Sequence, residues 1–306
     1  GDHRDLHRLI RRQRQMCIRD RSDSHGIGEL SLSFPGLLHS SGGSSILYNP
    51  PAPDPTQYRD RPIQLFSINY MNVSKPTNAS WIYEKGPTAP KNPTGWKPVQ
   101  IIPENAKSSK GGFPIKVNSR TNQAFWIELY TGKDRPSGIY SGQIKVQADG
   151  EERYLPVELG LFNFNLPDRN SIHAMVYFES EQPLRYQGRR LDAEYHRFAH
   201  RHRLELVHAY SVQTAENFIG RFLGGDFTPE KDYEGPGEGV GNTLIPASFY
   251  WPGTGYDNRD TAWRQSDEWM TFLNRNLSSY ITFLYMPDEP GWDQFPLIRK
   301  ISDNIH

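Results

Sequence analysis

The sequence predicts two folds in series: a β-sandwich on the N-terminal side and the first half of a (β/α)8 barrel after it. Its 306 residues are enough for about two domains. Residues 122–165 alternate apolar and polar side chains with a period of two, as antiparallel strands do. From Ser171 to the C-terminus, strand-like and helix-like segments alternate, which is typical of a parallel sheet covered by helices.

The first residues of the chain differ in composition from the rest. Residues 1–25 are rich in arginine, and the segment RQMCIRDRS resembles translated sequencing-adapter sequence found at the ends of metagenomic gene fragments. A basic arm for nucleic acid or a membrane is the alternative interpretation. We expect an artefactual or disordered tail and exclude it from the fold.

Residues 26–168 are expected to form the β-sandwich domain. Up to about Thr121 the chain is rich in proline, glycine and serine, and short strand-like runs stand between the turns. These runs are Ile63–Met71, Trp81–Tyr83 and Pro98–Ile102. Three longer strands follow, in the segments NQAFWIELYT, GIYSGQIKVQA and ERYLPVELGLFNF. The break at Asn165–Asp168 marks the predicted domain boundary.

Residues 169–306 are expected to contain four strand–helix units. The predicted strands are 171–180, 204–212, 243–251 and 280–286, and the predicted helices are 191–203, 215–222, 259–275 and 293–305. Half a barrel leaves two edge strands unpaired and exposes an apolar layer. The chain is therefore either truncated, or its four units form an open sheet. Because residues 1–25 also resemble the end of a fragment, we expect truncation.

Charge and cysteine content exclude several classes of function. Lysine plus arginine and aspartate plus glutamate number 35 each, so no nucleic-acid or anionic-membrane partner is indicated. No apolar run approaches the ~20 residues of a membrane span. Cys17 is the single cysteine, which rules out an internal disulfide and a cysteine-based zinc site. Nothing in the sequence indicates an oligomeric state.

Two motifs resemble cofactor or metal sites but lack essential residues. The loop GPGEGVGN (235–242) has the glycine density of a phosphate cradle without its lysine, so we expect no cofactor and interpret it as an active-site loop or a tight surface loop. His196 and His200 have the spacing of a zinc helix, but no glutamate follows the first histidine. We expect a solvated helix face there and no metal.

The candidate catalytic residues are two adjacent acids near the C-terminus. The apolar run Tyr280–Met286 reads as a buried strand, and it is followed by Pro287, Asp288, Glu289 and Pro290. Acids at the carboxyl end of a buried strand are typical of the active face of a barrel enzyme. The alternative is that one of them caps the following helix.

Other polar and aromatic side chains follow the predicted strands and are candidates for substrate binding. A sugar site needs aromatic platforms and hydrogen-bonding groups at the carboxyl ends of strands. By position, the candidates are Glu179, His208, Tyr210, Tyr250, Trp251 and Tyr285. The alternative for each of them is a place in the core or behind the residues that contact the ligand.

Four sequence blocks carry a resemblance to a known family. They are TNQAFWIELYTGKDRPSGIYSGQIKV, LPVELGLFNFNLPD, YEGPGEGVGNTLIPASFYWPG and YMPDEPG. In this order they resemble bacterial proteins with the domain of unknown function DUF4091, which are similar to glycoside hydrolase family 123. The resemblance covers about residues 60–306 and implies a β-sandwich joined to a (β/α)8 barrel, a carbohydrate substrate and an extracellular or periplasmic location.

The resemblance also implies roles for the acid pair. Enzymes of that family cleave terminal β-linked N-acetylgalactosamine with an adjacent Asp-Glu pair, which matches Asp288 and Glu289. Adjacent residues on an extended chain point to opposite sides, whereas ordinary glycosidases need carboxyl groups ~5–9.5 Å apart across the sugar. The pair therefore suits substrate-assisted hydrolysis, with Glu289 as general acid and base and Asp288 on the acetamido N–H.

Two other functions remain open from the sequence. One is a glycosidase of different specificity on the same scaffold, because a fold does not fix a substrate. The other is a non-catalytic protein that binds carbohydrate or has a structural role. With half of the barrel missing, we expect the 306-residue chain to be inactive on its own.

Overall fold

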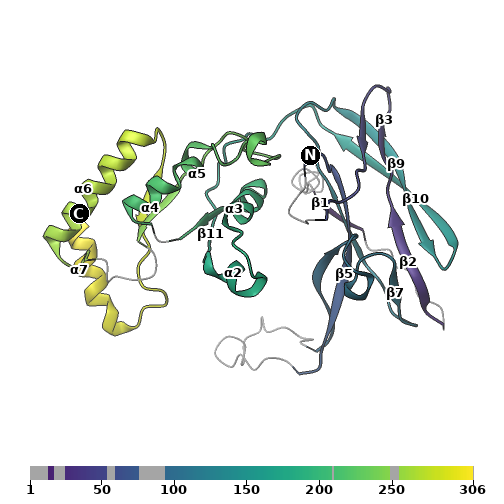
Figure 1. The fold of residues 1–306 in the computed structure, drawn as a ribbon, viewed down its shortest axis with the longest axis horizontal. Helices are drawn as coiled ribbons and strands as arrows, with labels where there is room; N and C mark the ends of the chain where they lie inside the picture. The colour runs from purple at the N-terminus through teal and green to yellow at the C-terminus, as the bar shows by residue number, and fades with distance from the viewer. Residues whose placement is uncertain are drawn as a thin grey trace, which may run out of the picture. The chain divides into compact units, whose positions relative to one another are not determined.

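The structure is a computed structural model, and Figure 1 shows its ribbon. The structure describes residues 13–16, 25–53, 59–75, 94–208, 210–248 and 255–305. The chain divides into two compact units, residues 1–165 and residues 166–306, and each is considered by itself. The fold is mixed, with antiparallel sheets in the first unit and short parallel strands with helices in the second.

The first unit contains two antiparallel sheets. The smaller sheet has the order β1 (Gln13–Met16), β8 (Phe125–Leu129), β5 (Ile63–Val73) and β6 (Gly95–Pro103). The larger sheet has the order β4 (Ser45–Leu47), β3 (Gly36–His39), β9 (Gly138–Ala148), β2 (Ile27–Ser33) and β7 (Ile115–Val117), and β10 (Glu151–Leu161) also pairs with β9. A 3-10 turn, Ser108–Lys110, precedes β7.

Both sheets contribute to one hydrophobic core. Leu32 and Ile144 come from the larger sheet, while Leu65 and Ile127 come from the smaller one. Their positions alternate with more exposed residues, which is the period-two pattern that the sequence shows. Burial of apolar surface between the sheets is therefore what stabilises this unit.

Several predicted elements of this unit can be compared with the structure. The strands expected in 122–165 correspond to β8, β9 and β10, although β8 lies in the other sheet. The runs at 63–71 and 98–102 lie in β5 and β6, while Trp81–Tyr83 lies outside the described residues. Strands β2, β3, β4 and β7 fall in the segment that the sequence suggested to be mostly loop. Part of the expected tail, Gln13–Met16, forms β1 and pairs with β8.

Strand β10 is an edge strand, because in the described part of the chain its partner is β9 alone. Figure 1 shows the two as a long hairpin. Pro156 lies within β10 and has no N–H to donate. Proline on an edge strand is a common protection against pairing with another chain.

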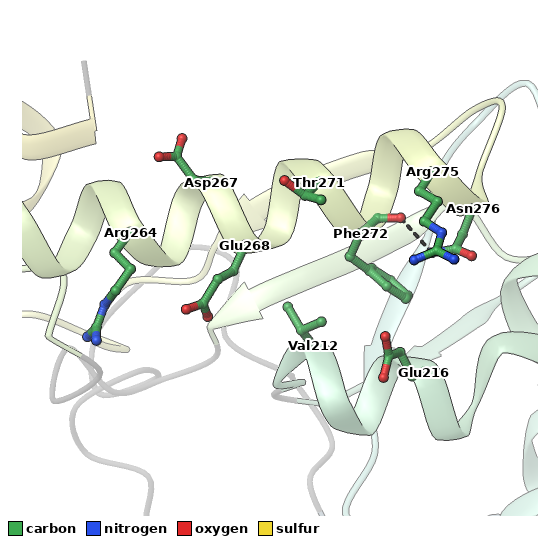
Figure 2. Close-up of a pocket in the computed structure, with 9 residues that line it drawn as sticks. All are labelled: Val212, Glu216, Arg264, Asp267, Glu268, Thr271, Phe272, Arg275 and Asn276. Carbon is green, nitrogen blue, oxygen red and sulfur yellow. Dashed lines mark hydrogen bonds between the residues drawn. The ribbon is translucent and has the colours of Figure 1, made fainter.

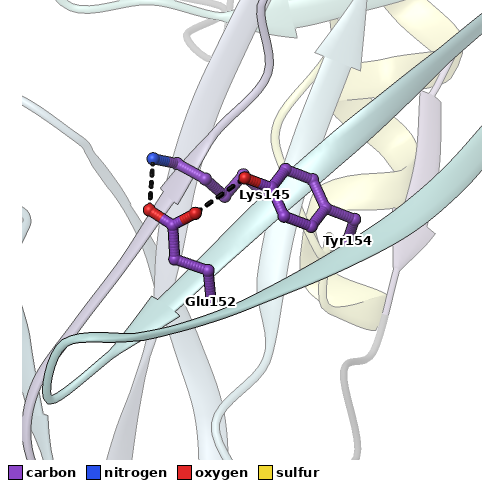
Figure 3. A network of polar contacts seen from close by, with 3 residues as sticks. All are labelled: Lys145, Glu152 and Tyr154. Carbon is purple, nitrogen blue, oxygen red and sulfur yellow. Dashed lines mark hydrogen bonds and ion pairs between the residues drawn. The ribbon is translucent and has the colours of Figure 1, made fainter.

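The exposed side of this hairpin carries a small polar network, shown in Figure 3. Lys145 Nζ lies 2.9 Å from Glu152 Oε1, and the Tyr154 hydroxyl donates to Glu152 Oε2 at 2.7 Å. The hydrogen bonds from Tyr154 and Lys145 lower the pKa of Glu152. Solvent screens such surface contacts, so they add little to stability.

We predict that Glu152→Gln leaves the urea midpoint of the first unit unchanged within experimental error, because the network is exposed to water. The comparison variant is Ile144→Ala in the shared core, which should lose about 2–5 kcal/mol through lost burial and a cavity. A loss in Glu152→Gln as large as that in Ile144→Ala would contradict this assignment.

The second unit alternates short strands with helices. Its strands are β11 (Met175–Tyr177), β12 (Glu205–Val207), β13 (Leu244–Ser248) and β14 (Ile281–Leu284). Its helices are α2 (Glu181–Gln187), α3 (Asp192–Arg201), α4 (Val212–Asn217), α5 (Ile219–Leu223), α6 (Arg259–Asn276) and α7 (Phe295–Ile305), with 3-10 turns at Pro229–Lys231 and Trp292–Gln294. No helix within the described ranges is long and apolar enough to cross a membrane.

The predicted half-barrel is not confirmed by the strand pairing. The strands form two parallel pairs, β11 with β12 and β13 with β14, and these pairs are separate sheets. The predicted helix at 215–222 is divided into α4 and α5, and α2 was not predicted. The strands are also shorter than the predicted ones. For example, β14 spans Ile281–Leu284, whereas the apolar run continues through Tyr285.

A buried carboxylate joins the two parallel pairs. Glu205 on β12 is 5% exposed, and its oxygens accept hydrogen bonds from Thr243 N (2.8 Å), Thr243 Oγ1 (2.9 Å) and Leu244 N (2.7 Å). On one side, Glu205 N donates to Ala174 O, and on the other, Ile281 N donates to Thr243 O. A row of hydrogen bonds therefore crosses all four strands, with a side chain as its central link.

The two faces of β14 pack against different partners. Phe283 and Tyr285 pack with Val207 and Leu244, which lie on β12 and β13. Leu284 and Met286 pack with a cluster on the helical side that contains Ala262 of α6, Leu297 and Ile301 of α7, and Tyr256. The strand is therefore apolar on both faces, as the run Tyr280–Met286 predicts.

We predict that Glu205→Ala lowers the free energy of unfolding of the second unit by about 3 kcal/mol or more, because the N–H groups of Thr243 and Leu244 lose a charged acceptor. Urea unfolding measures the loss. The matched control is Glu216→Ala on α4, an exposed glutamate whose replacement should change stability by no more than about 0.5 kcal/mol. Equal losses in both variants would contradict the bridging role.

Candidate active site

The acid pair lies where the β13–β14 sheet ends. Tyr285 N still donates to Ser248 O at 2.9 Å, which continues the parallel pairing one residue beyond β14. Pro287 is buried, and Asp288 and Glu289 after it are both exposed. The two carboxylates are therefore exposed to solvent at the carboxyl end of a parallel strand.

Glu289 has an unusual backbone conformation. Its φ is +46°, which places it in the left-handed region that non-glycine residues seldom adopt. Asp288 and Glu289 lie in a bend rather than on an extended chain, so the alternation expected for neighbouring strand residues does not apply to them. Conformations of this kind cost about 1–3 kcal/mol and cluster at functional sites.

Neither acid caps the helix that follows. The N-cap of the 3-10 turn Trp292–Gln294 is Gly291, whose N–H donates to Gln294 Oε1 at 3.1 Å. The acidic residue in the first turn is Asp293. Within the described residues, Asp288 and Glu289 have no hydrogen bond or ion pair. Their oxygens are therefore available to a ligand.

The structure separates the aromatic candidates into two groups. Tyr285 packs with Val207 of β12 and Leu244 of β13. The ring centroids of His208 and Tyr210 are 4.1 Å apart. Tyr210 is 5% exposed and belongs to a core cluster with Phe222 of α5. His208 and Tyr210 therefore pack on the helical side of β12, contrary to an arrangement in which all three line one pocket.

The remaining candidates have different surroundings. Glu179 is exposed between β11 and α2, and it accepts a hydrogen bond from Gln182 Nε2 at 2.7 Å. Burial, and then the charge of Glu179, raise the pKa of Tyr177 on β11. Tyr250 and Trp251 lie outside the described residues.

The histidines of α3 are not on a solvated helix face, so that expectation was wrong. His196 and His200 are both buried. His200 Nε2 donates to Gly237 O at 3.0 Å, and its ring stacks on Phe227 with centroids 3.7 Å apart. Its role is to hold the glycine-rich loop 235–242, which Asp168 also holds through Gly237 N at 2.9 Å.

This packing sets the charge state of three histidines. Burial, and then the Arg221 guanidinium, lower the pKa of His196 to about 2 and that of His208 to about 4. Burial also lowers the pKa of His200. All three side chains are therefore neutral at pH 7. Among the residues that the structure describes, no group of three or more His, Cys, Asp or Glu could hold a metal ion.

A groove of about 680 Å³ lies between α4 and α6, as Figure 2 shows. Phe272 and Val212 form its apolar part, and charged side chains of both signs surround them. Its lining residues are Val212, Glu216, Arg264, Asp267, Glu268, Thr271, Phe272, Arg275 and Asn276. None of the predicted site residues is among them, so this groove is distinct from the acid pair.

Comparisons with known proteins show distant similarity to solved structures. No family model and no curated protein matches the chain. Among solved structures, the chain is similar to a family 123 glycoside hydrolase from Clostridium perfringens, described for its hydrolysis of glycolipid glycans. The identity is 13% and the TM-score 0.41, and the match covers 83% of this chain and 38% of that enzyme. A similarity of this size carries no conclusion about fold or activity.

We predict that the second unit becomes less stable as the pH falls from about 6.5 to 4. His208 has an ordinary pKa of ~6.5 when unfolded and a pKa of about 4 when folded, so the unfolded chain binds more protons in this window. Its contribution by pH 5 is about 2 kcal/mol.

The measurement is urea unfolding of the wild type and of His208→Gln at pH 7 and pH 5. The variant has no imidazole at this position, so it should lose less stability on acidification than the wild type does. Equal losses of unfolding free energy in the two proteins between pH 7 and pH 5 would show that His208 is not held neutral by its surroundings.

Proposed function

We propose that this chain carries the catalytic acid pair of a retaining glycoside hydrolase that acts on β-linked N-acetylhexosaminides of the N-acetylgalactosamine type. The observation that carries the proposal is the pair itself. Asp288 and Glu289 are exposed, have no partner in the described residues and follow a parallel strand at its carboxyl end. The sequence resemblance to family 123 enzymes supports the same roles.

Glu289 is assigned as the general acid. It donates a proton to the glycosidic oxygen as the bond to the anomeric carbon breaks, and it later accepts a proton from the attacking water. Its left-handed conformation before Pro290 restricts the directions in which the carboxyl group can point. Such restriction supports catalysis, because a general acid must be held within hydrogen-bond reach of the leaving oxygen.

Asp288 is assigned as the group that orients the substrate. Two neighbouring residues cannot easily flank a sugar ring as acid and opposite nucleophile. In the substrate-assisted route, the oxygen of the 2-acetamido group attacks the anomeric carbon instead and forms an oxazolinium ion. Asp288 then accepts a hydrogen bond from the acetamido N–H and stabilises the positive charge of the intermediate.

The scaffold that we propose is the sandwich and half-barrel of the sequence prediction. Support comes from the core shared by the two antiparallel sheets and from the row of hydrogen bonds that crosses β11, β12, β13 and β14. The location outside the cytoplasm rests on the family resemblance.

The first test is Glu289→Gln, which keeps the size of the side chain and removes the transferable proton. We expect kcat/KM on an aryl β-N-acetylgalactosaminide to fall by about 10²–10⁴ fold. Activity is measured in the 306-residue chain and in the longest gene product that contains it. The matched control is Glu216→Gln, an exposed glutamate of α4 outside the acid pair and the loop 235–242, which should keep full activity. Near-normal turnover by Glu289→Gln would refute the assignment.

The second test is Asp288→Asn, with Asp293→Asn as the control on the neighbouring 3-10 turn. Asp288→Asn should lose activity on 2-acetamido substrates, because the developing oxazolinium charge loses its counter-ion. Full activity of this variant would argue against acetamido assistance.

Aryl glycosides with a 2-hydroxyl group separate the proposed N-acetylhexosaminidase from a glycosidase of other specificity. The latter would cleave them at least as well as the 2-acetamido substrate. Glycan binding without turnover by the active-length protein would indicate a non-catalytic binding protein.

A further inference from the structure

A cluster of buried nitrogen atoms without hydrogen-bond partners surrounds Arg221 of α5. They are Arg221 Nε and Nη1, His196 Nδ1 and Nε2, and His208 Nδ1. Buried polar atoms normally have a partner in the protein or in ordered solvent, so each exception needs an explanation. The five atoms come from α3, α5 and the residue after β12.

Arg221 is a buried positive charge with a weak counter-ion. Its side chain is 3% exposed, and its Cζ lies 3.9 Å from the centre of the Phe218 ring. The nearest approach to Asp226 is 3.9 Å, from Nε to Oδ2, and the Asp226 side chain is 41% exposed. A buried guanidinium needs a close acceptor to offset its loss of hydration, and this contact is too long to be a hydrogen bond.

The two neighbouring histidines add donors rather than acceptors. A neutral imidazole carries one N–H, so His196 and His208 each have a proton to donate. The positive charge of Arg221 lowers the pKa of both histidines, after the larger effect of burial. The Tyr210 hydroxyl oxygen accepts one hydrogen bond from the Arg221 side chain, and this bond and the positive charge oppose the rise in the pKa of Tyr210 that burial causes. The cluster therefore has one net positive charge and an excess of N–H groups.

We propose that a monovalent anion of halide size binds among Arg221, His196 and His208. It would accept hydrogen bonds from the guanidinium and from the two imidazole N–H groups, and it would neutralise the buried charge. A water molecule could accept two of these bonds, but it would bring two further donors and no charge. The aromatic rings of Phe178 and Phe218 beside the histidines favour a small anion over a divalent one, whose desolvation costs more.

The site is independent of the proposed hydrolase activity. The anion links the inner side of α3 to α5 and to the chain that leaves β12. These elements have no shared backbone hydrogen bonds at this point in the described residues. The bound ion is thus a structural ligand of the second unit.

The direct test is crystallography of the 306-residue chain grown in sodium bromide. We expect an anomalous bromide peak within about 3.5 Å of Arg221 Nη1. A peak confined to other parts of the surface, or ordered water in place of the ion, overturns the proposal. A rotated Asp226 carboxylate that bonds Nη1 directly overturns it as well.

A second test in solution compares melting in chloride and in gluconate at equal ionic strength. Chloride at about ten times its dissociation constant should raise the melting temperature of the wild type by about 4 °C. Arg221→Met should abolish this difference, while Arg264→Met, an exposed arginine of α6, should keep it.

If Arg221→Met does not fold, His196→Phe replaces it, because it removes one donor ring while filling the same space. Equal melting temperatures of the wild type in the two salts refute the proposal. A chloride effect that persists undiminished in Arg221→Met, or in His196→Phe when that variant is used, also refutes it.

Discussion

The second unit depends on the carboxylate of Glu205. The strand pairs β11–β12 and β13–β14 have regular backbone bonds within themselves, and Glu205 supplies the bonds between them. A buried charge is stable only when its oxygens accept several hydrogen bonds, and three donors at Thr243 and Leu244 meet this condition. The same constraint sets the position of Thr243, whose carbonyl accepts from Ile281 at the start of β14.

The hydrogen bond between Thr243 and Ile281 also affects the position of the acid pair, because the pair follows the same strand, β14. Ile281 fixes the start of β14, and the two apolar faces of the strand are held by different clusters. Within the described ranges, the last backbone hydrogen bond of this pairing is donated by Tyr285, and the chain then bends at Asp288 and Glu289. Asp288 and Glu289 therefore follow a half-buried strand that packs on both faces, rather than a long loop. A site on such a support keeps its geometry more closely than one on a loop.

Much of this site could be predicted from the sequence, because its signal is local. An apolar run that stops at a proline and is followed by two acids needs no tertiary information to be noticed. The side of the strand on which His208 and Tyr210 pack could not be predicted, since a strand buried on both faces has no polar alternation to orient it. Glu205 was also missed, because a single acid in a short strand has no pattern that indicates its partner. The burial of His200 depends on Phe227 and the loop 235–242, and His196 packs against Phe178; these partners are distant in sequence.

The sequence by itself determined the period-two strands of the first unit, the alternation of strands and helices in the second, and the adjacency of Asp288 and Glu289. These features follow from side-chain periodicity and covalent order. Only the tertiary structure decided that four strands form two pairs joined by a carboxylate, that Arg221 and two histidines, His196 and His200, are buried, and that Glu289 adopts a left-handed conformation. Those outcomes depend on contacts between residues far apart in the chain, and composition and spacing do not specify such contacts.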